Sequence, residues 1–316
     1  MPSGRRAFLT SVGAAATGLA GCLDGGESSR SPTRTPTASP SDTAAPDAVA
    51  LGDSVSIDGV TVTVSDLVTA HSVRYLSAPD AMDVLPTSDD QFVFVDVSAG
   101  GSGTTPSSHR FGLVADATPY GSGIEYIGPA RVDAPVTGRQ YGASNPDGFL
   151  GFRVPAPLDA ESVAVVLGGD GPERTDMQPD PDDVAARWSV PPAAVTPLRS
   201  PPPVFAASVD VPASVPATEP IPVTLDVRNE GDGPGVFRAA INHQGPQYGA
   251  TGIDRSLAAG ESITHEVTVD YYRDDDTTPG RVQFAVVGPD LSEFFEVGLD
   301  GGGTPAGTGT ATGGSR

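Results

Sequence analysis

Short stretches in which apolar and polar residues alternate, each closed off by glycine, proline or aspartate, restrict the fold of this chain most. The first runs from Val55 to Val64 around the pair Asp58-Gly59. Alternation with a period of two places the apolar side chains on one face of a strand, and Asp-Gly supplies the positive φ angles of a two-residue type I′ turn. Turn residues and alternation therefore independently predict a β-hairpin.

Similar stretches recur at short intervals along two parts of the chain. In the first part we expect strands at 92–97, 111–114, 124–127, 149–154, 163–167 and 184–190, and a longer insert of partly helical character at 71–88. In the second part we expect strands at 205–211, 223–228, 236–241, 263–271, 282–287 and 294–297. Short strands separated by turn residues predict an all-β chain with two immunoglobulin-like β-sandwich domains in tandem.

The first 22 residues carry the pattern of an export and lipidation signal. Arg5 and Arg6 precede a short apolar run, and residues 19–22 end in Cys22, the only cysteine of the chain. A twin arginine before such a run is read by the twin-arginine translocase, and the cysteine of a small-residue cleavage site receives a diacylglyceryl-type lipid. We expect a lipid on Cys22 to anchor the protein in the cell membrane, facing the exterior. The alternatives are a cleaved signal peptide with an incidental Cys22 and an uncleaved anchor helix.

The composition on either side of the sandwiches predicts disordered segments. Thirteen of the twenty residues at 27–46 are Ser, Thr or Pro, a composition also typical of O-glycosylated stalks. Six prolines at 191–203 predict a semi-rigid, polyproline-like linker that spaces the two domains apart. The predicted organisation is a signal peptide at 1–21, a lipidated, disordered tether at 22–48, a sandwich at 49–190, the linker at 191–203, a sandwich at 204–299 and a disordered tail at 300–316.

The charge of the chain argues against several classes of partner and reaction. Forty acidic residues face 18 basic ones, all arginine, for a formal net charge of -22. Such a surface repels nucleic acid, so no nucleic-acid partner is expected. The acids are scattered, which is typical of adaptation to high salt; a cation-binding acidic protein is the alternative. Without lysine, a Walker A loop and Schiff-base chemistry are excluded.

Three resemblances follow from these residues. The twin-arginine signal, the site at Cys22, the acidic surface and the missing lysine resemble exported lipoproteins of halophilic archaea. Residues 50–190, with Gly52-Asp53, the hairpin and the stretches 91–97 and 111–114, resemble a telokin-like, immunoglobulin-like domain of unknown function from prokaryotic lipoproteins, although 98–101 departs from its Asn-x-Gly. Residues 204–299, with 222–233 and 257–263, are similar to the cell-adhesion-related domain of bacteria and archaea. These domains imply extracellular structure or binding without catalysis.

Few residues have the spacing of a chemical site. The four histidines form neither an H-E-x-x-H motif nor an i, i+4 pair; they are His71, His109, His243 and His265. A weak Ca²⁺ candidate is the run Asp274, Asp275 and Asp276, although its spacing does not match the alternating Asp-x-Asp-x-Asp-Gly loop. A blue-copper site needs a free cysteine, and Cys22 is expected to carry lipid. No cofactor is therefore expected.

The resulting hypothesis is a non-catalytic, lipid-anchored extracellular protein that serves as a binding, adhesion or assembly module. Its expected partners are the membrane, through the lipid on Cys22, and an unidentified extracellular protein or glycan. One alternative is a solute-capture lipoprotein for a transporter, a class that usually has two α/β lobes around a cleft. The other is an exported hydrolase that uses His109 beside Ser107 and Ser108.

Overall fold

The computed structural model describes residues 46–124, 127–169, 183–244, 248–271 and 280–301. All of them belong to one compact unit, residues 44–316. Twenty strands, a single four-residue α-helix and two short 3₁₀ helices make up the regular structure of this described part. The predicted all-β fold class is therefore confirmed. The signal peptide, nearly all of the tether and all but the start of the tail lie outside the described residues.

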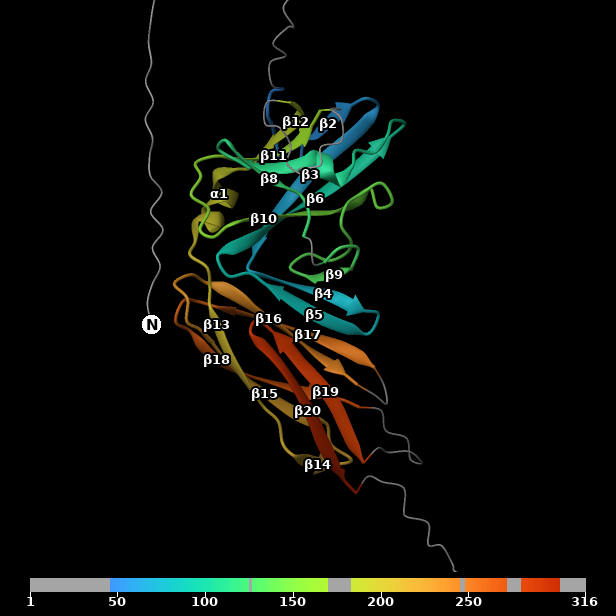
Figure 1. Cartoon of the computed structure of the whole chain (residues 1–316), viewed down its shortest axis with the longest axis vertical. Helices are drawn as coiled ribbons and strands as arrows, with labels where there is room; N and C mark the ends of the chain where they lie inside the picture. The colour runs from blue at the N-terminus through green and yellow to red at the C-terminus, as the bar shows by residue number, and fades with distance from the viewer. Residues whose placement is uncertain (1–45, 125–126, 170–182, 245–247, 272–279, 302–316) are drawn as a thin grey trace, which may run out of the picture. The chain divides into compact units, whose positions relative to one another are not determined.

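Two sheets face each other in the first sandwich (Figure 1). The first sheet holds, in spatial order, β1 (Val49–Ala50), β12 (Val184–Ser189), β11 (Val163–Gly168), β7 (Phe111–Ala115) and β8 (Thr118–Gly121). The second holds β10 (Asp147–Pro155), β6 (Asp90–Gly101), β3 (Val60–Ala70) and β2 (Ser54–Ile57). Side chains of both sheets meet in one core, in which Phe111, Phe152 and Trp188 are completely buried. Burial of this apolar surface is the main force that holds the two sheets together.

Most of the strands expected in this part are present. The Asp-Gly hairpin is confirmed, because Ile57 of β2 pairs with Val60 of β3 and the turn residues Asp58 and Gly59 have φ angles of 49° and 80°. The range 124–127 is the exception. Residues 125 and 126 of this range lie outside the described residues; Ile124 and Ile127 belong to no strand, and the backbone amide of Ile127 donates to the carbonyl of Ile124.

The insert at 71–88, expected to be partly helical, is a β-hairpin instead. Its strands β4 (Ser72–Ala78) and β5 (Ala81–Pro86) pair with each other, and β9 (Val132–Ala134) pairs with the other edge of β4. Val73 of this small sheet packs against Phe92 and Phe149 on the outer face of the β10-β6-β3-β2 sheet. The alternation was hidden because the hairpin carries apolar residues on both faces and is covered on both sides.

The second sandwich is built in the same way. Its first sheet holds β13 (Phe205–Asp210), β15 (Ile221–Asn229) and β18 (Ser262–Val269). Its second sheet holds β14 (Ser214–Pro216), β20 (Leu291–Asp300), β19 (Arg281–Gly288), β16 (Gly235–His243) and β17 (Gly249–Leu257). Leu225, Phe237 and Phe284 lie in the core between them. Each expected range contains a strand, whereas β14 and β17 were not predicted; β14 is short, and glycines interrupt the pattern of β17.

The proline-rich stretch between the sandwiches differs from the extended linker that we expected. Residues Pro192–Val195 form α1 and Thr196–Arg199 form the 3₁₀ helix η2. Val195 and Leu198 are buried in the first core, and the side-chain amide of Gln91 donates to the carbonyl of Leu198 at 2.7 Å. Proline in the first turn of a helix lacks only an N–H that has no partner there, so it can start a helix. The first half of the linker thus packs onto the first sandwich.

Candidate functional site

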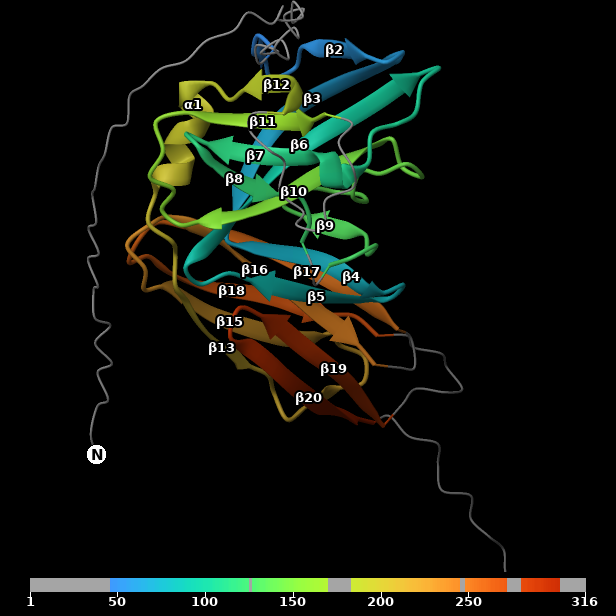
Figure 2. The same ribbon diagram turned by 45° about the horizontal axis from the view of Figure 1, so that its top comes forward.

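The β4-β5 hairpin also contacts the second sandwich, through its other face. It lies beside β16, β17 and β19, and Figure 2 shows β4 and β5 next to β16 and β17. The backbone amide of Met82 donates to Asn242 Oδ1 at 2.9 Å, and the Asn242 amide donates back to the Met82 carbonyl at 2.8 Å. The expectation that the two domains are spaced apart is therefore wrong, because the insert presents a second contact face.

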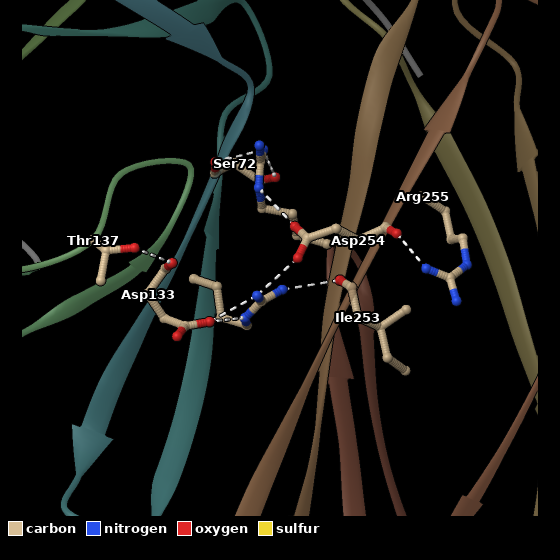
Figure 3. Close-up of polar contacts among 8 residues, drawn as sticks. Ser72, Asp133, Thr137, Ile253, Asp254 and Arg255 are labelled. Carbon is tan, nitrogen blue, oxygen red and sulfur yellow. Dashed lines mark hydrogen bonds and ion pairs between the residues drawn. The ribbon is translucent and has the colours of Figure 1, made fainter.

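Two buried arginines, one from each sandwich, share the carboxylate of Asp254, which is labelled in Figure 3. Arg74 of β4 is 5% exposed and Arg238 of β16 is 7% exposed. Arg74 Nη2 lies 2.8 Å from Asp254 Oδ2 and 2.7 Å from Asp133 Oδ2, and Arg238 Nε lies 3.2 Å from Asp254 Oδ1. We call Arg74, Arg238, Asp133 and Asp254 the arginine cluster. Its guanidinium groups stay charged at any physiological pH, so the cluster holds the sandwiches together and transfers no proton.

Backbone groups complete the coordination of both arginines. Arg74 Nη1 donates to the carbonyl of Ile253 at 3.0 Å, and Arg238 Nη1 donates to that of Ser72 at 3.1 Å. Burial works against the charge of Arg74, but the hydrogen bonds and charges of the two aspartates outweigh it and raise its pKa. Burial lowers the pKa of Arg238, which Asp254 only partly offsets. The cluster therefore depends most on Asp254, the one carboxylate that both arginines contact.

A groove of about 600 Å³ opens on the part of the β10-β6-β3-β2 sheet that the small sheet leaves uncovered. Two cross-strand rows on this outer face form its floor: Thr63, Ser98 and Asp147 in one, and Ser65, Asp96 and Phe149 in the other. Their neighbours along the strands, such as Val64 and Val97, point into the core. Because side chains alternate along a strand, the polar ones of the floor point outward.

The segment before β10 forms the wall of the groove. Its lining residues are Arg131, Thr137, Gly138, Arg139 and Asn145. Val132 and Gly138 exchange two backbone hydrogen bonds of 2.7 and 2.9 Å, and the Asn145 side-chain amide donates to the carbonyl of Gln140 at 3.1 Å. The wall touches the floor at Gly148, where an added Cβ would clash with the Asn145 amide and lie 2.7 Å from the Arg139 carbonyl oxygen. These contacts within the protein hold the wall of the groove in place against its floor.

Four charged side chains of the groove are not engaged within the protein. The guanidinium groups of Arg131 and Arg139 and the carboxylates of Asp96 and Asp147 make no hydrogen bond or ion pair with any other residue of the described ranges. Burial raises the pKa of Asp96, and the negative charge of Asp66 raises it further. Asp66 has a φ of 48° and lies where the β3-β6 register shifts, a bulge of the kind found near binding sites. The groove therefore offers both donors and acceptors to a ligand.

The site residues expected from the sequence fall outside this groove. Arg5, Arg6, Cys22 and the run Asp274, Asp275 and Asp276 lie outside the described residues. Across the described ranges, no group of three or more His, Cys, Asp or Glu side chains could hold a metal ion. Nor does that part of the chain contain a helix of sufficient length and apolarity to cross a bilayer.

The histidines are spread over both sandwiches. His71 lies between β3 and β4, where burial lowers its pKa. His109 is an exposed residue of the 3₁₀ helix η1 (Ser108–Arg110), and the carbonyl of Ser108 accepts a hydrogen bond from Ser122 Oγ at 2.6 Å. His265 Nε2 lies 2.7 Å from Arg255 Nη2, and burial lowers its pKa. Burial also lowers the pKa of His243, the last residue of β16.

Comparisons with known proteins identify no family for this chain. No family model and no curated protein matches it. A solved β-glucosidase from Listeria innocua, in complex with glucose, aligns over 34% of this chain with 18% identity and a TM-score of 0.26; the chain spans 17% of the length of that structure. A β-sandwich protein from Clostridium difficile 630 aligns over its whole length and 48% of this chain, with 13% identity and a TM-score of 0.29. Likenesses this weak carry no function over to this chain, and the all-β architecture is evident from its own sheets.

Proposed function

We propose that this chain is a non-catalytic, lipid-anchored protein of the cell exterior that binds its partner through the groove of the first sandwich. The observation that carries this proposal is the set of unengaged charges at Arg131, Arg139, Asp96 and Asp147, on a floor and wall that the protein itself holds in place. A binding surface whose backbone is already held in place loses little entropy when a ligand arrives, which favours recognition.

Anchorage and export rest on the sequence. The twin arginine at Arg5 and Arg6 and the cysteine at Cys22 have the spacing of a lipoprotein signal, and the composition of the chain resembles that of exported haloarchaeal lipoproteins. A diacylglyceryl-type anchor carries two acyl chains, enough for stable membrane attachment. The Ser/Thr/Pro-rich tether would then hold the groove away from the membrane surface.

The absence of catalysis is part of the same proposal. It is supported by the two buried arginines, Arg74 and Arg238. Both pair with Asp254 at the contact between the sandwiches, so neither guanidinium group is available to a substrate. His109, the histidine of the hydrolase alternative, is exposed on η1 and has no hydrogen-bond or ion-pair partner in the described ranges. The solute-capture alternative usually needs two α/β lobes, whereas the described chain forms β-sandwiches.

Cross-linking on intact cells tests the proposed binding face. A photo-reactive phenylalanine derivative at Ser98, on the groove floor, is expected to cross-link a component of the cell exterior. The same residue at Thr118, an exposed position of β8, is the matched control and should give no product. Products from neither position, or from both equally, contradict the groove as the binding face. Recovery of unlipidated protein from the cytosol contradicts the anchorage.

A further inference from the structure

We infer that the groove binds a neutral, hydroxyl-rich oligosaccharide, an inference that rests on the groove being the binding face proposed above. Its lining combines two carboxylates, two guanidinium groups, the hydroxyls of four Ser and Thr side chains and one side-chain amide; these residues are Asp96, Asp147, Arg131, Arg139, Thr63, Ser65, Ser98, Thr137 and Asn145. The lining thus offers both hydrogen-bond donors and hydrogen-bond acceptors, and more of each than a ligand with one charged group would use.

The balance of charge selects against ions. The whole chain carries 40 acidic and 18 basic residues, yet the groove lining holds two of each. An anionic ligand would meet Asp96 and Asp147, with Asp66 close by, and a cation would meet Arg131 and Arg139. Like charges brought close together in a binding site are unfavourable. A neutral ligand avoids both penalties.

The chemistry of the lining matches neighbouring hydroxyl groups. A carboxylate can accept hydrogen bonds from two adjacent hydroxyls, and a guanidinium presents two parallel donors. The side chains of Ser and Thr both donate and accept, so they can satisfy hydroxyl groups in either sense. A sugar ring offers such adjacent hydroxyls, and a groove of about 600 Å³ is within the size range of small-ligand sites.

A protein partner fits the groove less well. Protein interfaces depend on buried aromatic or apolar anchors, with Trp, Tyr and Arg as the main contributors. The apolar residues of the lining, Val97 and Phe149, are both 2% exposed, and Phe149 is already packed in the core beneath the small sheet. The groove therefore presents no apolar side chain on which a peptide could be anchored.

Titration calorimetry on the lipid-free chain from residue 44 onward, which is one compact unit, tests this inference. The probes are cellotriose, maltotriose and mannotriose as neutral sugars, trigalacturonate as an acidic one, and deacetylated chitotriose as a basic one. We expect a neutral sugar to bind, and Asp96→Asn and Arg139→Gln each to weaken that binding about tenfold or more, because each removes a charged hydrogen-bond partner. Thermal melting of each variant shows whether it remains folded.

The matched control is Asp226→Asn, which changes an outward-facing aspartate on the second sandwich and should leave binding unchanged. Binding of only the acidic or the basic sugar, binding of none of the five, or equal binding by wild type and groove variants would overturn the inference. If no sugar binds but Ser98 still cross-links a cell-surface component, the oligosaccharide is wrong and the binding face stands. If both results are negative, the proposed function fails as well.

Discussion

Replacing Asp254 by asparagine removes the carboxylate that both buried arginines contact. Arg74 keeps Asp133 and the Ile253 carbonyl, whereas Arg238 loses its carboxylate partner and keeps the neutral contact with Ser72. Asparagine retains the size of the side chain and one acceptor oxygen. The variant therefore removes charge from the contact between the sandwiches and leaves its shape nearly unchanged.

The expected loss follows from the burial of the groups involved. Removing one partner of a buried ion pair destabilises a protein by about 3–5 kcal/mol. The Asp254 side chain is 43% exposed, and Arg74 keeps a second carboxylate, so solvent and Asp133 reduce that loss. We expect the free energy of unfolding to fall by about 2–3 kcal/mol. Because the lost contacts join the two sandwiches, we also expect them to unfold separately.

Urea unfolding followed by two signals measures both effects. The fluorescence of Trp188, the only tryptophan, reports on the first sandwich, and far-UV circular dichroism reports on both. In the wild type the two transitions should coincide, and in Asp254→Asn they should separate. The control is Glu296→Gln, which breaks an exposed pair with Arg281 inside the second sandwich and should change little. Coincident transitions at the wild-type midpoint in the Asp254 variant would refute this account of the contact.

Three further substitutions test other parts of the structure. In Gly252→Ala the added methyl group would clash with the Arg74 guanidinium and lie 2.6 Å from its Nη2. The same urea assay should therefore show separated transitions. An unchanged curve would mean that Arg74 can move without loss of the contact between the sandwiches. In Gly148→Ala the methyl group should push the wall off the floor at Asn145, and calorimetry should show weaker sugar binding; unaltered affinity would contradict a preorganised wall. Burial lowers the pKa of His71, so the unfolded chain takes up a proton that the folded one does not, and stability should fall as the pH drops below about 6.5. His71→Gln should lose less stability than wild type between neutral pH and pH of about 5, measured by thermal melting, and an equal loss would assign the effect to other groups.

Local patterns in the sequence were enough to predict most of the strands. The Asp58-Gly59 hairpin was predictable because the turn residues and the alternation both lie within ten neighbouring residues. The β4-β5 hairpin was missed because it is covered on both faces, which removes the alternation. Arg74 of this hairpin was a weak signal, since a charged residue that is buried in a strand needs a partner, but nothing local indicates that the partner is Asp254.

The groove could not be predicted for a different reason. Thr63, Ser98 and Asp147 lie on three strands that are distant in sequence, and only the register of the pairing brings them into one row. Outward-facing polar residues on a strand are typical of any solvated sheet, so none of the three stands out alone. What distinguishes them is the wall beside them, and its position depends on Gly148 and on contacts formed only in the folded protein.

Backbone NMR of the chain from residue 44 onward, with a neutral trisaccharide titrated in, tests most directly that this protein binds at the groove and leaves its ligand unchanged. The account predicts saturable shifts of the amide signals of Thr63, Asp96, Ser98 and Gly148, while the sugar signals show the same intact trisaccharide at the end of the titration. Shifts confined to other surfaces, or the appearance of shorter sugars in the same tube, would contradict it.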